Sequence, residues 1–339
     1  MRTHVACIML ACLLAVLVGP VGDALEQAAP ERDKYDAAKA VRARELIRQA
    51  RIAAGGEQAL QSVTSLSATG QLRRFVKYVY IKSPTRVEER EKVIRGKISI
   101  KFLLPNKSRL GLSTSTLLGT RYSYAEVING DWAWRNPPLQ ALSSSKNRHV
   151  IDVSDFERSL AYQAQDARQE LTLYSLAWLV QGLPRYSVEL SHEGWLQTKD
   201  GKADVIAVHS ANDFQLWFLL NQETRLPLGF VSRFSMSQAE PVLVERTFFF
   251  SVSYLRGLQE RVRQERATQA AKPPKRSEWQ MHLSDHRRVA GILLPHRLTM
   301  TVDGRRVEEL TITRFEVNHG VNPKDFERKP DTGSIPRGR

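Results

Sequence analysis

The chain has 339 residues, of which 42% are hydrophobic, a content that suffices for a globular core and excludes an intrinsically disordered protein. With 50 Lys and Arg against 36 Asp and Glu, the net charge is +14. Such a surface favours anionic partners, among them phospholipid head groups, lipopolysaccharide and acidic polymers.

The first 24 residues are typical of a secretory signal peptide. A single arginine precedes an apolar run from Val5 to Val18, and small residues follow up to Ala24. This run is short for a membrane span. We therefore expect a signal peptide of residues 1–24 and a periplasmic mature chain, which excludes nucleic acid as a partner. In the alternative, the letters MLAC ending at Cys12 are a lipid-attachment motif.

Both cysteines of the chain, Cys7 and Cys12, lie within this expected signal peptide. The mature chain is therefore expected to have no thiol, no disulfide and no cysteine metal ligand.

A helix is the first element expected in the mature chain, over residues 31–54. One of its faces is apolar and another carries arginines, as in an amphipathic helix; the apolar residues are Leu46, Ile47, Ala50, Ala53 and Ala54. Gly55 supplies the left-handed conformation that commonly ends a helix. An alternating segment follows at once, so the sequence indicates a helix connected directly to a sheet.

Four turn signals predict antiparallel hairpins in the rest of the chain. Asn129-Gly130, Asp200-Gly201 and Asp303-Gly304 each separate two apolar segments, and these pairs tolerate the positive φ angles of two-residue hairpin turns. A looser turn lies in LNQETRLPLGF, residues 220–230. The sequence therefore predicts one continuous antiparallel sheet of eight or more strands.

Three expected strands present apolar side chains at alternate positions, and these residues are the candidate ligand contacts: Ile98, Ile100, Phe102 and Leu104; Trp132 and Trp134; Phe214, Leu216 and Phe218. In the third strand Trp217 and Leu219 occupy the opposite face. Apolar residues on both faces predict that both sides of this strand are covered.

A second helix is expected over residues 154–181. Ser154 and Glu157 have the spacing of a capping box, apolar residues follow at steps of three and four, and Gly182 comes directly after the helix. We expect both helices to lie on the concave side of the sheet. A charged, basic segment at about 236–278 is expected as a helical or loop insertion.

No motif in the sequence indicates catalysis with the specificity that an enzyme needs. Ser143 and Lys146 have the spacing of a serine acylase, but they lie in an expected loop without the partner motifs. His282 and His286 have a helical metal-ligand spacing, but on the strand expected here they would lie roughly 13 Å apart. We therefore expect no metal, no cofactor and no enzymatic activity.

Several short motifs together resemble a known family. The helix ending AAGG leads into SLSATG, and then come KFLLPNKSRL, INGDWAW, FLLNQETRLPLGF and the closing segments GILLPHRLT and EELTITRFEVNHGVNPKDFE. In this order they resemble periplasmic proteins related to the lipoprotein carriers LolA and LolB, over most of the mature chain. The resemblance implies an α+β fold: a strongly curved antiparallel half-barrel whose concave face is covered by helices, as a single domain over residues 25–339.

The resemblance also implies a function, because members of this superfamily bind lipid or acyl chains in the concave face. The first hypothesis is an exported carrier that binds a lipid or a lipidated protein in an apolar trough, with an anionic membrane surface as a further partner. The second is an envelope sensor or scaffold similar to RseB. The third is a hydrolase of an envelope polymer that uses an unrecognised pair of acids.

Overall fold

The computed structural model describes residues 37–83, 85–115, 119, 121–130, 132–136, 171–180, 188–210, 215–236, 242–244, 252–270 and 275–327. The predicted signal peptide, the start of the first predicted helix and the residues of the SSSK motif lie outside these ranges.

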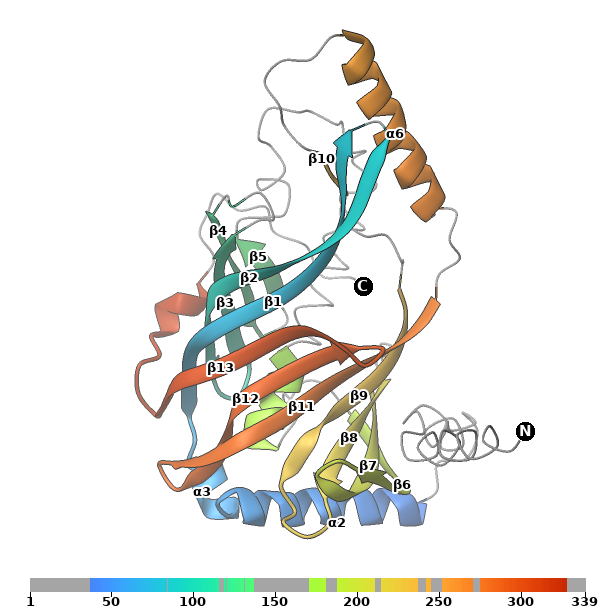
Figure 1. Ribbon diagram of the computed structural model, residues 1–339. Coiled ribbons are helices and arrows are strands. Elements are labelled where there is room, and N and C mark those ends of the chain that lie inside the picture. Colours follow the sequence, from blue (N-terminus) through green and yellow to red (C-terminus); the bar gives the residue numbers. More distant parts are fainter. Residues whose placement is uncertain are drawn as a thin grey trace, which may run out of the picture.

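One large sheet dominates the molecule (Figure 1). Its strands are β1 (Ser65–Ser83), β2 (Arg86–Leu103), β3 (Lys107–Ser115), β4 (Arg121–Asn129), β5 (Trp132–Asn136), β6 (Val188–Thr198), β7 (Gly201–Ser210), β8 (Gln215–Asn221), β9 (Pro227–Met236), β10 (Val242–Val244), β11 (Lys275–Val289), β12 (Ile292–Val302) and β13 (Arg305–Val317). Their order is β5-β4-β3-β2-β1-β13-β12-β11-β9-β8-β7-β6, so the described sheet is open, with β5 and β6 at its two ends. All neighbours along this path are antiparallel, whereas β10 pairs with β1 in parallel. The predicted curved antiparallel sheet with helices is confirmed.

The predicted hairpins are all present. Turns at Asn129-Gly130, Asp200-Gly201 and Asp303-Gly304 join β4 to β5, β6 to β7 and β12 to β13. Their glycines have positive φ angles of 61°, 106° and 75°, which other residues rarely adopt. The looser turn joins β8 to β9.

Among the described residues, four helical segments accompany the sheet, together with the short 3-10 helix η1 (Pro323–Phe326). Helix α2 (Ala37–Ala54) runs along the lower end of the sheet in Figure 1, and α3 (Glu57–Gln61) follows it into β1. Residues 171–179, here called the central helix, are the described part of the second predicted helix. Helix α6 (Val252–Ala270) lies within the predicted basic insertion.

Strands β1 and β2 form a long arm beyond the rest of the sheet, at the top of Figure 1. Their pairing continues to Ser83 and Arg86, and β10 and α6 lie beside the arm. Val262 of α6 packs against a small apolar cluster that contains Val79 and Ile81. Of the inserted segment, β10 and α6 therefore lie against the arm.

Candidate binding trough

The main apolar cluster of the protein lies on one face of the sheet, which we call the inner face. It gathers alternate residues of the strands together with α2, α3 and the central helix. Because successive side chains of a strand point to opposite faces, Ile98, Ile100 and Phe102 of β2 all enter this cluster. Leu46 and Ala50 of α2 reach it from the end of the sheet.

The central helix occupies the middle of the inner face. Every residue from Leu171 to Val180 is buried, including Thr172 and Ser175. A helix that is buried on all sides must be surrounded by other elements, unlike a helix that covers a surface with one face. The inner face of this structure is therefore filled by the protein's own chain.

Aromatic rings anchor this helix to the sheet. Trp178 is fully buried; its ring stacks on Tyr174 at a centroid distance of 5.3 Å and meets Phe102 and Phe315 edge-on at 6.1 and 5.3 Å. Such pairs contribute roughly 0.5–1.5 kcal/mol each beyond the burial of apolar area. The indole Nε1 of Trp178 is buried and has no hydrogen-bond partner among the described residues.

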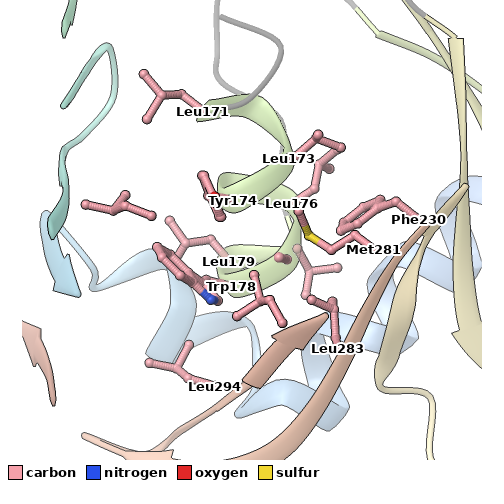
Figure 2. Close-up of a cluster of buried hydrophobic side chains, with 14 of the residues drawn as sticks. Leu171, Leu173, Tyr174, Leu176, Trp178, Leu179, Phe230, Met281, Leu283 and Leu294 are labelled. Atoms are coloured by element: carbon pink, nitrogen blue, oxygen red, sulfur yellow. The ribbon is translucent and has the colours of Figure 1, made fainter. Parts of the chain in front are cut away.

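The other side of the helix contacts the second half of the sheet. Figure 2 shows Leu176 on the side facing Phe230 and Met281, and Trp178 on the opposite side. Leu283 and Leu294 also belong to this cluster. Strands β9, β11 and β12 thus contribute to the site, although sequence reasoning had not selected them; their apolar residues at alternate positions were the available signal.

The candidate ligand contacts divide into three groups. Residues of β2 and β8 come together as expected: Ile98, Ile100, Phe102, Leu216 and Phe218 are buried in the inner cluster, and Leu104 packs against it. Trp134 instead packs with Val127 and Phe326 in a separate cluster. Phe214 and the side chain of Trp132 lie outside the described residues.

The position of Trp134 follows from the alternation of β5. Its neighbour Ala133 points into the inner cluster, so Trp134 points to the opposite, outer face, where Phe326 of η1 covers it. Trp134 therefore does not converge with the inner faces of β2 and β8. Whether the inner-face residues contact a ligand stays a prediction.

The prediction that both faces of β8 are covered is confirmed. Phe218 lies in the inner cluster, stacked on Phe230 at 4.9 Å, whereas Trp217 and Leu219 are buried in an outer cluster with Val205 and Val231. Both faces of this strand are thus covered.

A buried carboxylate, that of Asp204, lies at the edge of the inner face. Its carboxylate accepts hydrogen bonds from Arg225 Nη1 at 2.8 Å and Gln222 Nε2 at 3.0 Å, and it lies 3.3 Å from His192 Nε2. On the outer face, the buried carboxylate of Glu309 accepts from Arg297 and Arg306. Each of these two acids therefore contacts cations, an arrangement that differs from the paired carboxylates of a glycosidase.

Three further observations concern His282, the possible metal ligands and the apolar length of the helices. His282 lies on a strand as predicted and contacts Asp200 at 2.7 Å. Within the described ranges, no cluster of three His, Cys, Asp or Glu residues has the geometry to hold a metal ion. None of the helices described is long and apolar enough to cross a membrane.

Known proteins were compared with the chain by family, by sequence and by structure. No family model matches the chain, and no curated protein matches it by sequence. Similar solved structures include a LolA superfamily protein from Nitrosomonas europaea, with 12% identity and a TM-score of 0.40 over 84% of this chain and 97% of that one.

Two more distant structures also match. A DUF1329 family protein from Desulfovibrio piger has 8% identity and a TM-score of 0.33 over 84% of this chain and 97% of that one. MucB has 11% identity and a TM-score of 0.22 over 88% of this chain and 66% of that one. The solved structures that match thus include members of the superfamily that the sequence motifs resemble, at identities and TM-scores that carry no argument about function.

Proposed function

We propose that the mature chain, residues 25–339, is a periplasmic single-domain protein that binds the acyl chain of a lipid or of a lipidated protein on its inner face. The observation that carries this proposal is the central helix, which is buried on every side inside an open sheet. In this proposal the helix occupies the trough when cargo is absent and gives way to the acyl chain.

The energetics support an exchange of this kind. Burying ~14 methylenes contributes roughly 11 kcal/mol before the costs of association. The acyl chain takes the place of leucine, tyrosine and tryptophan side chains that the same face already buries. Because one apolar group replaces another, the net free-energy change is much smaller than the gross term, and a carrier that must also release its cargo needs this balance.

The polar groups around the trough also favour binding over hydrolysis. Asp204 is held by Arg225 and Gln222, so its carboxylate is already engaged by hydrogen-bond donors. No catalytic group is required for the exchange of an acyl chain.

Titration with a fluorescent fatty acid tests the proposal. Phe102 lies on the inner face of β2 in contact with Trp178, and Arg95 lies exposed on the outer face of the same strand. Phe102→Glu is expected to weaken probe binding by at least about tenfold, because a carboxylate in the trough must lose its hydration when an alkyl chain enters. Arg95→Glu, the matched control, is expected to bind the probe normally.

Thermal melts of both variants accompany the titration, since Phe102 is fully buried. If Phe102→Glu does not fold, Phe102→Leu replaces it, with a smaller loss of probe affinity expected. A folded Phe102 variant with unchanged probe binding contradicts the proposed site. Native mass spectrometry of protein purified from its own envelope adds a second readout: a retained lipid mass supports a carrier, and a retained protein alone favours the scaffold hypothesis.

A further inference from the structure

A shallow groove with a volume of about 530 Å³ crosses the outer face of the sheet, opposite the trough. It spans five neighbouring strands, β13, β1, β2, β3 and β4. At about 4.8 Å between strands this is a distance of roughly 19 Å. The groove is thus wide enough for a polar head group, and it shares no space with the central helix.

The groove is built from outward-facing positions in register across the strands. Thr69 pairs with Ser99, Ser99 pairs with Gly111, and Lys97 pairs with Ser113. Gly111 leaves the middle of the groove open: a Cβ there would meet its nearest atom, Arg109 Nη1, at 3.6 Å. The guanidinium of Arg109 therefore lies beside this bare stretch of backbone.

The lining has the composition of an anion site. It contains the cations Lys97 and Arg109, and none of the residues that line it is acidic. Hydroxyl groups supply the remaining polar atoms; those of Ser113 and Ser123 contact each other at 3.0 Å. Neither cation has a hydrogen bond or an ion pair with any residue that the structure describes.

Nearby cations of the outer face differ in this respect. Lys101 contacts Asp325 at 2.7 Å, and Arg314 contacts Glu316 at 2.6 Å. Arg297 contacts the buried carboxylate of Glu309. These three cations are neutralised by direct ion pairs, whereas Lys97 and Arg109 make none with the described residues; at longer range, and against the effect of burial, the charge of Arg109 helps Lys101 to hold the pKa of Asp325 below its usual value.

We propose that this groove binds the phosphate and hydroxyl groups of an anionic phosphoglycerol head group, and so holds the protein on an anionic membrane surface. The planar fork of Arg109 matches two phosphate oxygens, and Lys97 adds a compact charge on the neighbouring strand. The serine and threonine hydroxyls around them can bond the glycerol. This proposal does not rest on the trough, because it uses the opposite face of the sheet.

Vesicle binding tests the charge requirement. The full mature chain is titrated with vesicles of 30% phosphatidylglycerol in phosphatidylcholine, and with pure phosphatidylcholine as the neutral reference. Lys97→Gln with Arg109→Gln is expected to weaken binding to the anionic vesicles by roughly 20-fold, from the usual contribution of two surface cations. Arg44→Gln with Lys77→Gln removes the same charge elsewhere and is expected to change binding by about twofold or less.

A second variant tests the groove itself at constant charge. Gly111→Val fills the open stretch, and valine suits a strand whose glycine has no positive φ angle. We expect a melting temperature that is unchanged or higher and anionic vesicle binding that is at least fivefold weaker. Unchanged binding of Gly111→Val, or an equal loss in the Arg44 and Lys77 control, overturns the proposal, as does binding of soluble glycerol 3-phosphate without vesicle binding.

Discussion

The two faces of the sheet use the same strands for different purposes. On β2, Ile98 and Phe102 point into the inner cluster, whereas Lys97 and Lys101 on the outer face carry charge. The alternation of strand side chains makes this division possible. The inner face holds a helix of the chain itself, and the groove on the outer face presents Lys97 and Arg109, which make no direct ion pair with the described residues.

The division is not uniform along the sheet. In the half formed by β6 to β9, the outer face is also apolar, with Trp217 and Leu219 buried in a cluster of their own. In the half formed by β1 to β4, the outer face is mainly polar, apart from the small cluster around Trp134. Binding to a polar head group is therefore expected only in the half formed by β1 to β4.

The largest expected effect is at the anchor of the central helix. Trp178→Ala should lower the free energy of unfolding by about 3–5 kcal/mol, because it leaves a cavity between the helix and two sheet aromatics. Trp195→Ala is the control: this side chain is 58% exposed, and a change within about 0.5 kcal/mol is expected. Chemical denaturation measures both. Equal effects would mean that the helix is not packed as described.

The next effect concerns a buried polar cluster. Asp204→Ala should lower the free energy of unfolding by about 2–3 kcal/mol, since Arg225 and Gln222 lose a charged acceptor. Asp285 pairs with Arg287 at the surface, and Asp285→Ala should cost at most about 1 kcal/mol. Urea denaturation of the two variants checks the difference. A small cost at Asp204 would show that its contacts are replaced by water.

A smaller difference in stability is expected between alanine substitutions at two glycines. A Cβ at Gly70 would lie 2.3 Å from the Thr311 carbonyl oxygen, so Gly70→Ala should cost roughly 1–2 kcal/mol through a forced shift of β1 against β13. A Cβ at Gly111 meets only ordinary contacts, and Gly111→Ala should be neutral or slightly stabilising. Thermal melts decide the order; a stabilised Gly70→Ala would contradict the close approach.

The smallest effect depends on pH. Burial, and to a lesser extent the charges of His282 and His296, hold the pKa of His286 below its usual value of 6.5, although Asp285 acts in the opposite direction. The unfolded chain then binds more protons than the folded one below pH 6.5, so stability should fall as the pH drops through this range and stay level above it. In His286→Gln the fall should be shallower. A melting temperature with the same pH slope in both proteins would exclude this role.

The parts of the fold that sequence reasoning predicted depend on local signals. Asn-Gly and Asp-Gly turns determine their hairpins without help from distant residues, and alternation on β2 assigns its inner face correctly. The predicted second helix is confirmed over residues 171–179 because its apolar steps are regular. These features need only one segment of sequence at a time.

The parts that were missed depend on contacts between distant segments. Alternation on β5 places Trp134 and Ala133 on opposite faces, but which of the two faces is the inner one is decided by the neighbouring strands, and Phe326, which covers Trp134, lies nearly two hundred residues later. The parallel pairing of β10 with β1 and the contact of Arg225 with Asp204 have no local signal. The outer groove likewise requires the register of several strands before Lys97 and Arg109 become neighbours of the same open stretch.

The most direct test of the trough is hydrogen exchange of the central helix with and without a bound acyl chain. In the free protein, amides of residues 171–179 should exchange slowly, since the helix is buried on all sides. On saturation with a fatty acid, exchange in this segment should speed up while the strands β1, β2 and β13 remain protected. If the fatty acid binds and the central helix stays equally protected, or becomes more protected, the proposed exchange of helix for cargo is contradicted.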